Sequence, residues 1–434
     1  MREMISPELD PRNLFRRLLR LSSTDVGRFA SASATVQGLP LISAPILSRL
    51  YSPDAFGQYG VFYALAAILS AVALLSLNNA VLNERDDRTA FRTLVALFIP
   101  CAGFCLILAF TLYFVPTEFL TMAFREVDRH ILVFLPLTIL LASLNTAGYT
   151  WALRMGRYVF LAKYKLVLGL ATMCLQLGIG VFQFEAIGLV VANLLGYFLA
   201  GCLLLRHVMQ SDREFLTAVQ TLSFFDLLLR NRGLVTHTTP ASLINMLGTY
   251  LPEILINRFF GSYVLGQYSL GMRVIGMPVA FVSSTVQDVF RREATREYLE
   301  SGRCDKSFRR VFGLMTGIAG FVLLPIVLVL PKIFPVLFGS AWSEAGGLVQ
   351  AVALLILVRF VASPLSYVWI ITGRTGLDLM WQLGLVLLTL GVFLGARLVQ
   401  SAVSPTALLQ TYSLVIGFWY LLCLALSYRW SRTP

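Results

Sequence analysis

Apolar residues recur along this chain in runs of about twenty, and short stretches of charged or turn-forming residues separate the runs. A helix of about twenty apolar residues spans the hydrocarbon core of a membrane, which is roughly 30 Å thick. We therefore predict an all-α polytopic membrane protein with about twelve transmembrane helices. The predicted helices are residues 27–49, 57–82, 93–114, 131–152, 158–182, 186–205, 235–256, 264–289, 311–331, 345–371, 379–397 and 407–427.

The composition supports this pattern, because 57% of the 434 residues are hydrophobic and 13% are charged, against about 25% charged in soluble domains. A net charge of +12 would indicate a nucleic-acid partner in a soluble protein, but the cytoplasmic loops of membrane proteins are themselves basic. We therefore expect membrane lipids, and no nucleic acid, as partners. Residues 1–20 are polar and basic and do not resemble a cleavable signal peptide, so we expect a cytoplasmic, amphipathic tail.

The distribution of Lys and Arg predicts the orientation of the helices, because cytoplasmic loops are enriched in both residue types. With the N-terminus inside, most of the 35 basic residues fall in cytoplasmic segments, and the richest segment follows the eighth predicted helix. Both termini are then cytoplasmic. The predicted external loops hold the few exceptions, Arg49, Arg125, Arg129, Arg258, Lys332 and Arg397.

One phrase occurs twice in the chain: SRLYSPDAFGQY begins at residue 48 and NRFFGSYVLGQY at residue 257. The shared Arg and the shared Gly-Gln-Tyr are 209 residues apart in both cases, and each phrase follows the first helix of a six-helix half. A second echo, Gly-Arg at residues 156–157 and 373–374, follows the fourth and tenth helices. We predict two parallel six-helix repeats, 1–206 and 235–434, joined by a linker, 207–234, that contains an amphipathic helix. Two such lobes are a common architecture for a transporter that works by alternating access.

The repeated phrase predicts the tight outer turns between the first two helices of each half. Ser-Pro-Asp and Gly-Ser supply the turn residues, and Gly57 and Gly266 permit close approach to a neighbouring helix. The Tyr and Phe residues suit an aromatic belt at the membrane surface. Arg49 and Arg258 are candidates for anchoring at outer headgroups or for an outer gate.

At residues 45–87 and 252–294, and in the later stretches FPVLFGSAWSEAG and RFVASPLS, the chain resembles Wzx-type polysaccharide flippases. These flippases belong to the multidrug/oligosaccharidyl-lipid/polysaccharide exporter superfamily. The resemblance implies a V-shaped pair of lobes around a cationic cavity in the bacterial inner membrane. It implies transfer of undecaprenyl-pyrophosphate-linked oligosaccharide repeat units to the outer leaflet, for lipopolysaccharide O-antigen or exopolysaccharide synthesis. A polysaccharide polymerase and a chain-length regulator are the further partners it suggests.

A diphosphate substrate requires cations at membrane depth. A Lys or Arg at the centre of a membrane helix costs about 2.5–3.5 kcal/mol, so its presence calls for a hydrated cavity, a partner or a route to the interface. Arg273 and Arg359 lie too deep to reach the surface easily and are either cavity residues or members of a structural pair. Lys163 and Lys165 lie about 200° apart on one helix, so both cannot face the cavity, and either can extend to the interface instead. The cationic candidates are Arg273, Arg359, Lys163, Lys165 and Arg28, the last at the inner end of the first helix.

Two further groups of residues are candidates for coupling and movement. Glu253 is the clearest acidic residue in a predicted span, and it either binds a coupling ion or pairs with Arg258 or Arg273. His237 is either a proton relay or a neutral, hydrogen-bonded histidine. Prolines interrupt the first and seventh helices, which are the corresponding helices of the two halves, and this favours moving elements that line a cavity. These prolines are Pro40, Pro45, Pro240 and Pro252.

The sequence offers little support for other functions. The longest predicted external loop, 115–130, contains Glu118, Glu126 and Asp128 but no acid–base or metal-binding pattern, and no nucleotide-binding motif occurs. We therefore expect neither an enzyme, such as a membrane polymerase or ligase, nor a metal or cofactor. The closer alternative is a multidrug or small-molecule antiporter of the same superfamily, whose cavity would be acidic.

Overall fold

The computed structural model describes residues 25–116, 118–119, 125–217, 224–399 and 403–432. Within these ranges the chain is helical, with no strand. Eleven of the described helices are long and apolar enough to cross a membrane. The twelfth predicted span, the seventh in order, is also a long helix but is more polar, because it carries Thr, Asn and Glu residues. The predicted N-terminal tail lies outside the described residues.

The first six spans form one bundle. They are α2 (Asp25–Leu50), α3 (Pro53–Ala73) followed by α4 (Asn78–Asn83), α5 (Asp87–Ala96) with α6 (Phe98–Phe114), α8 (Arg129–Leu132) with α9 (Leu135–Arg154), α10 (Tyr158–Gly180) and α11 (Glu185–Ser211). Helix α10 packs between α2 and α11, and α9 packs against α3, α6 and α11. The predicted second helix is broken at residues 74–77, where Leu75 and Ser76 have left-handed backbone angles.

The last six spans form the second bundle. They are η1 (Leu234–Thr238) with α14 (Thr239–Phe260), α15 (Ser262–Ser301), α16 (Asp305–Ile318) with η2 (Ala319–Leu323) and α17 (Leu324–Phe338), α18 (Ala345–Ala351) with α19 (Ala353–Leu365) and α20 (Val368–Ile371), α21 (Thr375–Val399) and α22 (Pro405–Ser431). A short turn, η3 (Ser340–Trp342), precedes α18. Helix α22 packs on α19 and α21, and α14 packs on α21.

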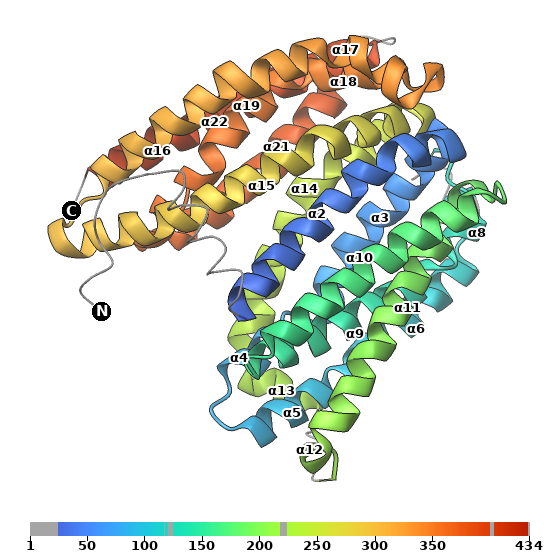
Figure 1. Ribbon diagram of the computed structural model, residues 1–434, viewed down its shortest axis with the longest axis vertical. Coiled ribbons are helices and arrows are strands. Elements are labelled where there is room, and N and C mark those ends of the chain that lie inside the picture. Colours follow the sequence, from blue (N-terminus) through green and yellow to red (C-terminus); the bar gives the residue numbers. More distant parts are fainter. Residues whose placement is uncertain (1–24, 117, 120–124, 218–223, 400–402, 433–434) are drawn as a thin grey trace.

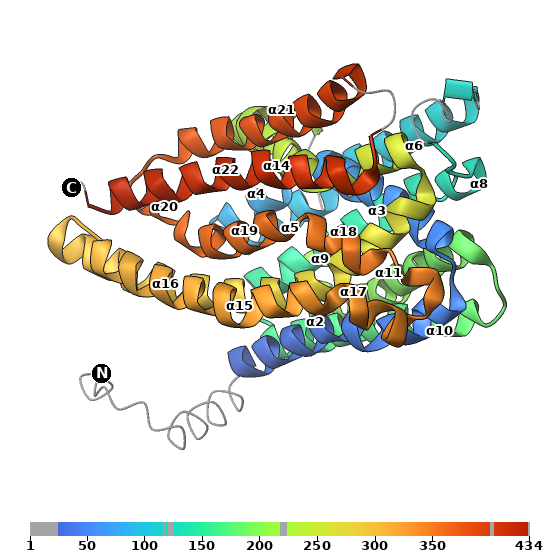
Figure 2. The ribbon, with the colours of Figure 1, turned by 90° about the horizontal axis from the view of Figure 1, so that it is seen from above.

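The bundles meet at one end and diverge at the other, which gives the molecule a V shape (Figure 1). We call the end that holds the α2–α3 and α14–α15 turns the hairpin end, and the opposite end the linker end. Helix α3 packs on α14 and α15, and α2 runs beside α15 (Figures 1 and 2). At the linker end, the far ends of α15 and α16 lie apart from α4, α12 and α13.

Helix α15 is longer than the sequence predicts. It has 40 residues rather than the predicted 264–289, and a helix of this length extends about 60 Å, twice the hydrocarbon thickness. Hydropathy detects only its apolar part, because the remainder, after residue 289, is charged. The helix ends at Gly302, whose φ of 68° forms a left-handed C-cap.

The linker connects the bundles at the linker end. Within the predicted linker, the structure describes two short helices, α12 (Arg213–Thr217) and α13 (Phe224–Arg230), and residues 218–223 lie outside the described part. Leu227 is buried, whereas Phe225 and Leu229 are exposed. Asp212, 1% exposed, accepts hydrogen bonds from Arg157 and from Trp151 Nε1. These contacts attach the start of the linker to the first bundle.

The second sequence echo has a structural counterpart. Gly156 and Gly373 have φ angles of 67° and 71°, and the residue after each glycine donates its backbone N–H to a carbonyl five residues earlier. Those bonds join Arg157 to Ala152 and Arg374 to Trp369. The fourth span of each half therefore ends with the same left-handed glycine cap. This supports the origin of the two halves as repeats.

Candidate functional site

The repeated phrases contact each other across the boundary between the bundles. A Cβ atom on Gly57 would lie 1.8 Å from the carbonyl oxygen of Ser262, and one on Gly266 would lie 1.8 Å from that of Pro53. Each pair of equivalent residues is 209 positions apart, so the crossing of α3 and α15 has approximate twofold symmetry. The prediction that both glycines permit close approach is confirmed.

Other side chains reinforce this crossing. Trp342 donates its indole N–H to the Ser48 carbonyl at 2.8 Å and packs edge-on against Phe56, with the ring centroids 5.2 Å apart. Glu126, in the loop before α8, accepts the backbone N–H of Ser262 at 3.0 Å. The carboxylate thus stabilises the N-terminus of α15 from the opposite bundle, where the helix dipole favours negative charge. All these contacts lie at the hairpin end and hold the bundles together there.

A cavity of about 470 Å³ lies between the bundles, immediately beneath the crossing. Four helices of the first bundle (α2, α3, α10 and α11) and two of the second (α14 and α15) supply its walls. The crossing closes it on the hairpin side. Its volume is within the range of about 300–1,000 Å³ that is typical of small-molecule sites.

Two charged side chains line the cavity. Arg273 of α15 is partly buried, and its guanidinium carbon lies 5.5 Å from the centre of the Phe56 ring, a cation–π distance. Glu253 of α14 is its neighbour in the cavity wall. The two interact electrostatically, but no salt bridge shorter than 4.0 Å joins them among the described ion pairs. Arg273 therefore keeps hydrogen-bond donors for a ligand.

Tyrosine side chains form much of the remaining surface. Tyr59 and Tyr63 of α3 have ring centroids 6.1 Å apart, and Tyr63 lies 6.0 Å from Tyr250 of the second bundle. Tyr197 of α11 lines the same cavity. The sequence places Tyr59 in an aromatic belt, and this is wrong, because its side chain is buried beneath the crossing and faces the cavity.

Uncharged hydrogen-bonding groups lie among these rings. Asn193 is 6% exposed, and its side-chain N–H₂ has no hydrogen-bond partner in the described structure. The Ser269 hydroxyl is likewise buried without a partner among the described residues. Both residues line the cavity, as does Gln176. The sequence does not single out Asn193 or the tyrosines as site residues, although the i, i+4 spacing of residues 193 and 197 and of residues 59 and 63 places each pair on one helix face.

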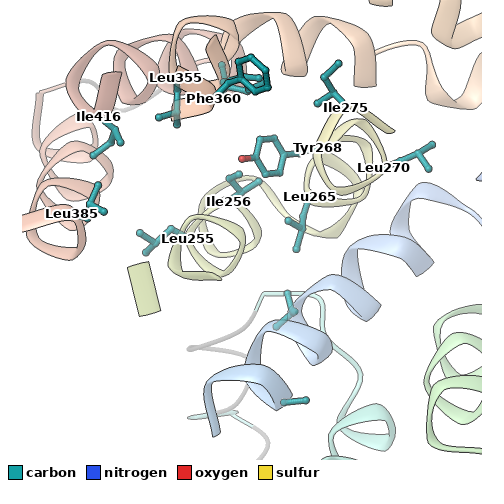
Figure 3. Packing of buried hydrophobic residues seen from close by; sticks show 14 of the residues in the cluster. Leu255, Ile256, Leu265, Tyr268, Leu270, Ile275, Leu355, Phe360, Leu385 and Ile416 are labelled. Atoms are coloured by element: carbon teal, nitrogen blue, oxygen red, sulfur yellow. The ribbon is translucent and has the colours of Figure 1, made fainter. Parts of the chain in front are cut away.

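Arg359 lies in a different place from Arg273. It is exposed on α19 and does not line this cavity, and it interacts electrostatically with Tyr268, Tyr412 and Tyr420 of the second bundle. Figure 3 shows the Tyr268 ring pointing into that bundle, among apolar side chains of α14, α19 and α22. Tyr268 interacts electrostatically with Glu253 as well as with Arg359.

The lysines and Arg28 also lie outside the cavity wall. Lys165 donates to the Ser33 hydroxyl at 2.9 Å, and its Nζ lies 4.3 Å from the centre of the Phe29 ring. Lys163 is exposed and points elsewhere, as the angle between the two positions requires. Arg28 is exposed near the start of α2 and lies 3.8 Å from Asp25. Lys165 therefore has partners on α2.

The proline, histidine and outer arginine candidates lie in three places: at or near the cavity, towards the linker end, and at the hairpin end. Pro40 lines the cavity, and Pro252 is buried in α14 one position before Glu253. His237 and Pro240 are exposed towards the linker end, and a π-helical turn, η1, contains the histidine. At the hairpin end, Arg49 is exposed, Arg258 is partly buried, and Pro45 lies one turn before Arg49.

Comparison with known proteins identifies the family. Residues 46–346 match the family described as "Polysaccharide biosynthesis protein". The chain belongs to this family. The teichuronic acid biosynthesis protein TuaB of Bacillus subtilis is 26% identical over 183 residues, 41% of this chain and 38% of TuaB. The match with that curated relative therefore spans less than half of its length.

Solved structures show the fold of this polysaccharide biosynthesis protein. The lipid II flippase MurJ, in an inward closed conformation, gives a TM-score of 0.71 at 11% identity over 92% of this chain and 87% of that one. A transporter of the MOP superfamily from Pyrococcus furiosus gives 0.59 at 14% identity over 96% and 97%. An inward-facing MATE multidrug transporter gives 0.58 at 14% identity over 91% and 94%. The predicted all-α, two-lobed transporter fold is confirmed.

Proposed function

We propose that this protein is a flippase that moves undecaprenyl-pyrophosphate-linked oligosaccharides from the inner to the outer leaflet of the bacterial inner membrane. The observation that carries the proposal is the position of Arg273. This cation lines a cavity that lies between two membrane bundles and is closed at one end only by helix contacts. Membership of the polysaccharide biosynthesis family supports a sugar-bearing substrate.

The proposed orientation follows the distribution of basic residues. The linker end is cytoplasmic, with both termini, and the hairpin end faces outward. The contacts at the hairpin end then represent an inward-facing state, in which the cavity is shut from the outside. Transport requires the crossing of α3 and α15 to open while residues 1–206 and 235–434, the proposed lobes, approach each other at the linker end. The interrupted helices α2 and α14 are the proposed moving elements, with Pro40, Pro45, Pro240 and Pro252 as their hinges.

The charged residues take separate roles in this proposal. Arg273 binds the diphosphate, because a guanidinium presents several N–H donors to phosphate oxygens. Glu253 carries the coupling proton or cation. Its negative charge is offset by Arg273 in the empty cavity, and it becomes free to bind the ion when the diphosphate takes over Arg273. Arg359, exposed on α19 outside this cavity, offers a further cation to the anionic substrate. Lys165 and Arg28 lie near the inner end of α2, where they attract the anionic lipid before it enters.

Glu253 also supports a second candidate function, a multidrug antiporter. A carboxylate in the cavity would attract an organic cation, and tyrosine rings bind such cations well. Arg273 opposes this reading, because it lies in the same cavity and would repel a cationic drug. We therefore place the flippase first.

The deciding experiment uses cells in which this gene is deleted, in a strain that has no redundant flippase. Surface polysaccharide is measured together with lipid-linked repeat units extracted from the membrane. Missing polysaccharide with repeat units accumulating on the cytoplasmic side is the expected result, and the mass of those units identifies the glycan. Normal polysaccharide combined with increased drug sensitivity would overturn the flippase in favour of the antiporter. A polymerase and a chain-length regulator are the proposed partners downstream.

A further inference from the structure

We propose that the cavity contains a sugar subsite distinct from the diphosphate site, formed by Asn193, Tyr197, Tyr63 and Tyr250, and that it takes a neutral sugar. The inference rests on the proposed flippase function and specifies which part of the substrate these residues bind. It assigns the first sugar, the one attached to the diphosphate, to this surface. Arg273 supplies the charge contact, and the subsite supplies contacts that require a sugar ring.

The first step is the unpartnered amide. Asn193 is 6% exposed, lines the cavity, and has a side-chain N–H₂ without a hydrogen-bond partner in the described structure. Leaving such a buried group unpaired is energetically unfavourable. A ligand oxygen that accepts this bond would therefore bind with a corresponding advantage. Sugar hydroxyl and acetamido groups supply such oxygens.

The second step is the arrangement of the aromatic rings. Tyr63 lies 6.1 Å from Tyr59 and 6.0 Å from Tyr250 across the two bundles, measured between ring centroids. Tyrosine combines an apolar face with a hydroxyl that both donates and accepts. A sugar has the complementary pattern, because its C–H groups gather on one face and its hydroxyls surround the edge. Tyr197 follows Asn193 by one helical turn, so the ring and the amide lie on the same face of α11.

The third step concerns charge. Glu253 is the carboxylate in the cavity wall, and Arg273 is the cation that would bind the diphosphate. Once the diphosphate occupies Arg273, the carboxylate of an acidic sugar would lie close to Glu253 with no cation of the cavity wall left to offset the repulsion. The surface around Asn193 is uncharged. A neutral hexose or an N-acetylated hexosamine therefore fits, and a uronic acid does not.

The fourth step is the contribution of both bundles. Asn193 and Tyr63 belong to the first bundle, whereas Tyr250 belongs to the second. A sugar bound between them would contact both sides of the boundary that must rearrange during transport. The subsite thus recognises the sugar in the inward-facing state and releases it when the bundles separate at the hairpin end.

The test is a binding assay on the purified full-length protein in nanodiscs. The probes are undecaprenyl diphosphate alone and the same lipid carrying glucose, N-acetylglucosamine or glucuronic acid. We expect a neutral-sugar lipid to bind about threefold to tenfold more tightly than the bare lipid, as one or two uncharged hydrogen bonds predict. Asn193→Leu should remove that preference, so that this variant binds the bare lipid and the sugar-bearing lipid equally well. Tyr197→Phe, which keeps the ring, should reduce the preference less.

The matched control is Asn245→Leu, the same change at an exposed position of α14 that does not line the cavity. It should leave both affinities unchanged. Equal binding of bare and sugar-bearing lipids by the unaltered protein would overturn the subsite and leave the flippase intact. Tighter binding of the glucuronic acid lipid would overturn the neutral-sugar assignment. If the unaltered protein binds no diphosphate lipid at all, the flippase proposal itself fails.

Discussion

Gly57 meets Ser262 across the boundary between the two bundles, so closely that a Cβ atom on the glycine would lie 1.8 Å from the Ser262 carbonyl oxygen. The equivalent residues Pro53 and Gly266 repeat the contact at the same distance. The two repeated segments thus place the N-termini of α3 and α15 in direct backbone contact. Nothing larger than hydrogen fits at either position without moving a helix.

The first prediction concerns that crossing. Gly57→Ala should force α3 and α15 apart, because the obstructing atoms belong to the backbone and cannot rotate away. Overpacking of this kind costs about 1–3 kcal/mol, and the loss should appear as a lower Tm in detergent. We also expect faster labelling of a cysteine at Ser269 by an impermeant maleimide from the outside, because the hairpin end opens.

Gly38→Ala is the matched control, since a Cβ at this position of α2 meets nothing within 4 Å. Alanine also has the higher helix propensity, so this variant should be as stable as the unaltered protein or more so. If the Gly57 and Gly38 variants behave alike in both measurements, the crossing is not the closed gate.

Much of the architecture follows from the sequence because it depends on local signals. The apolar runs predict the spans, and the repeated glycines predict close approach to a neighbouring helix, although not that the two repeats meet each other. Arg273 and Glu253 are found because an isolated charge within an apolar run has few structural uses. The C-terminal end of α15 is not predicted, because the residues after 289 are charged and a hydropathy pattern does not detect a charged helix.

The walls of the cavity could not be predicted in the same way. Tyrosine in an apolar run is consistent with a core position, a belt position or a site, and only the packing of α3 against α14 decides among them. Arg359 illustrates the same limit. The sequence indicates how deep this residue lies in its membrane span, but not which way its side chain faces. The bond between Lys165 and Ser33 joins residues 132 positions apart, and no local pattern indicates it.

The second prediction concerns Glu126. Glu126→Ala should remove the acceptor for the Ser262 N–H and loosen the start of α15. The carboxylate is about half exposed, so we expect a stability loss of about 1 kcal/mol or less. Hydrogen exchange of the amides at residues 262–266 should be faster in this variant. Glu126→Gln retains a carbonyl acceptor and should restore most of the protection, whereas equal exchange in the Ala variant and the unaltered protein would contradict the contact.

The third prediction tests the diphosphate site. Arg273→Gln should lower transport of a lipid-linked oligosaccharide into the outer leaflet of proteoliposomes by about tenfold to hundredfold, which corresponds to the loss of a charge-assisted hydrogen bond. Arg273→Lys should be intermediate, because an ammonium cannot bind phosphate oxygens in the bidentate manner of guanidinium. Membrane levels of both variants, measured by immunoblot, should match those of the unaltered protein.

The control for this measurement is Arg296→Gln on the exposed part of α15, where the arginine forms a solvent-accessible pair with Glu300. Its transport should be unchanged. A drop in the membrane level of Arg273→Gln, with normal transport per molecule, would assign Arg273 to folding rather than to the substrate.

The fourth prediction concerns the buried carboxylate at the start of the linker. Asp212 is 1% exposed and receives hydrogen bonds from Arg157 Nη1 at 2.8 Å and Trp151 Nε1 at 3.0 Å. Asp212→Asn would place an N–H₂ group against the guanidinium and leave that cation without its partner. Breaking such a buried pair costs about 3–5 kcal/mol, whereas Glu300→Gln, in an exposed pair, should cost about 1 kcal/mol or less. We therefore expect a clear drop in Tm for Asp212→Asn alone, and equal Tm values for the two variants would show that this ion pair does not hold the linker to the first bundle.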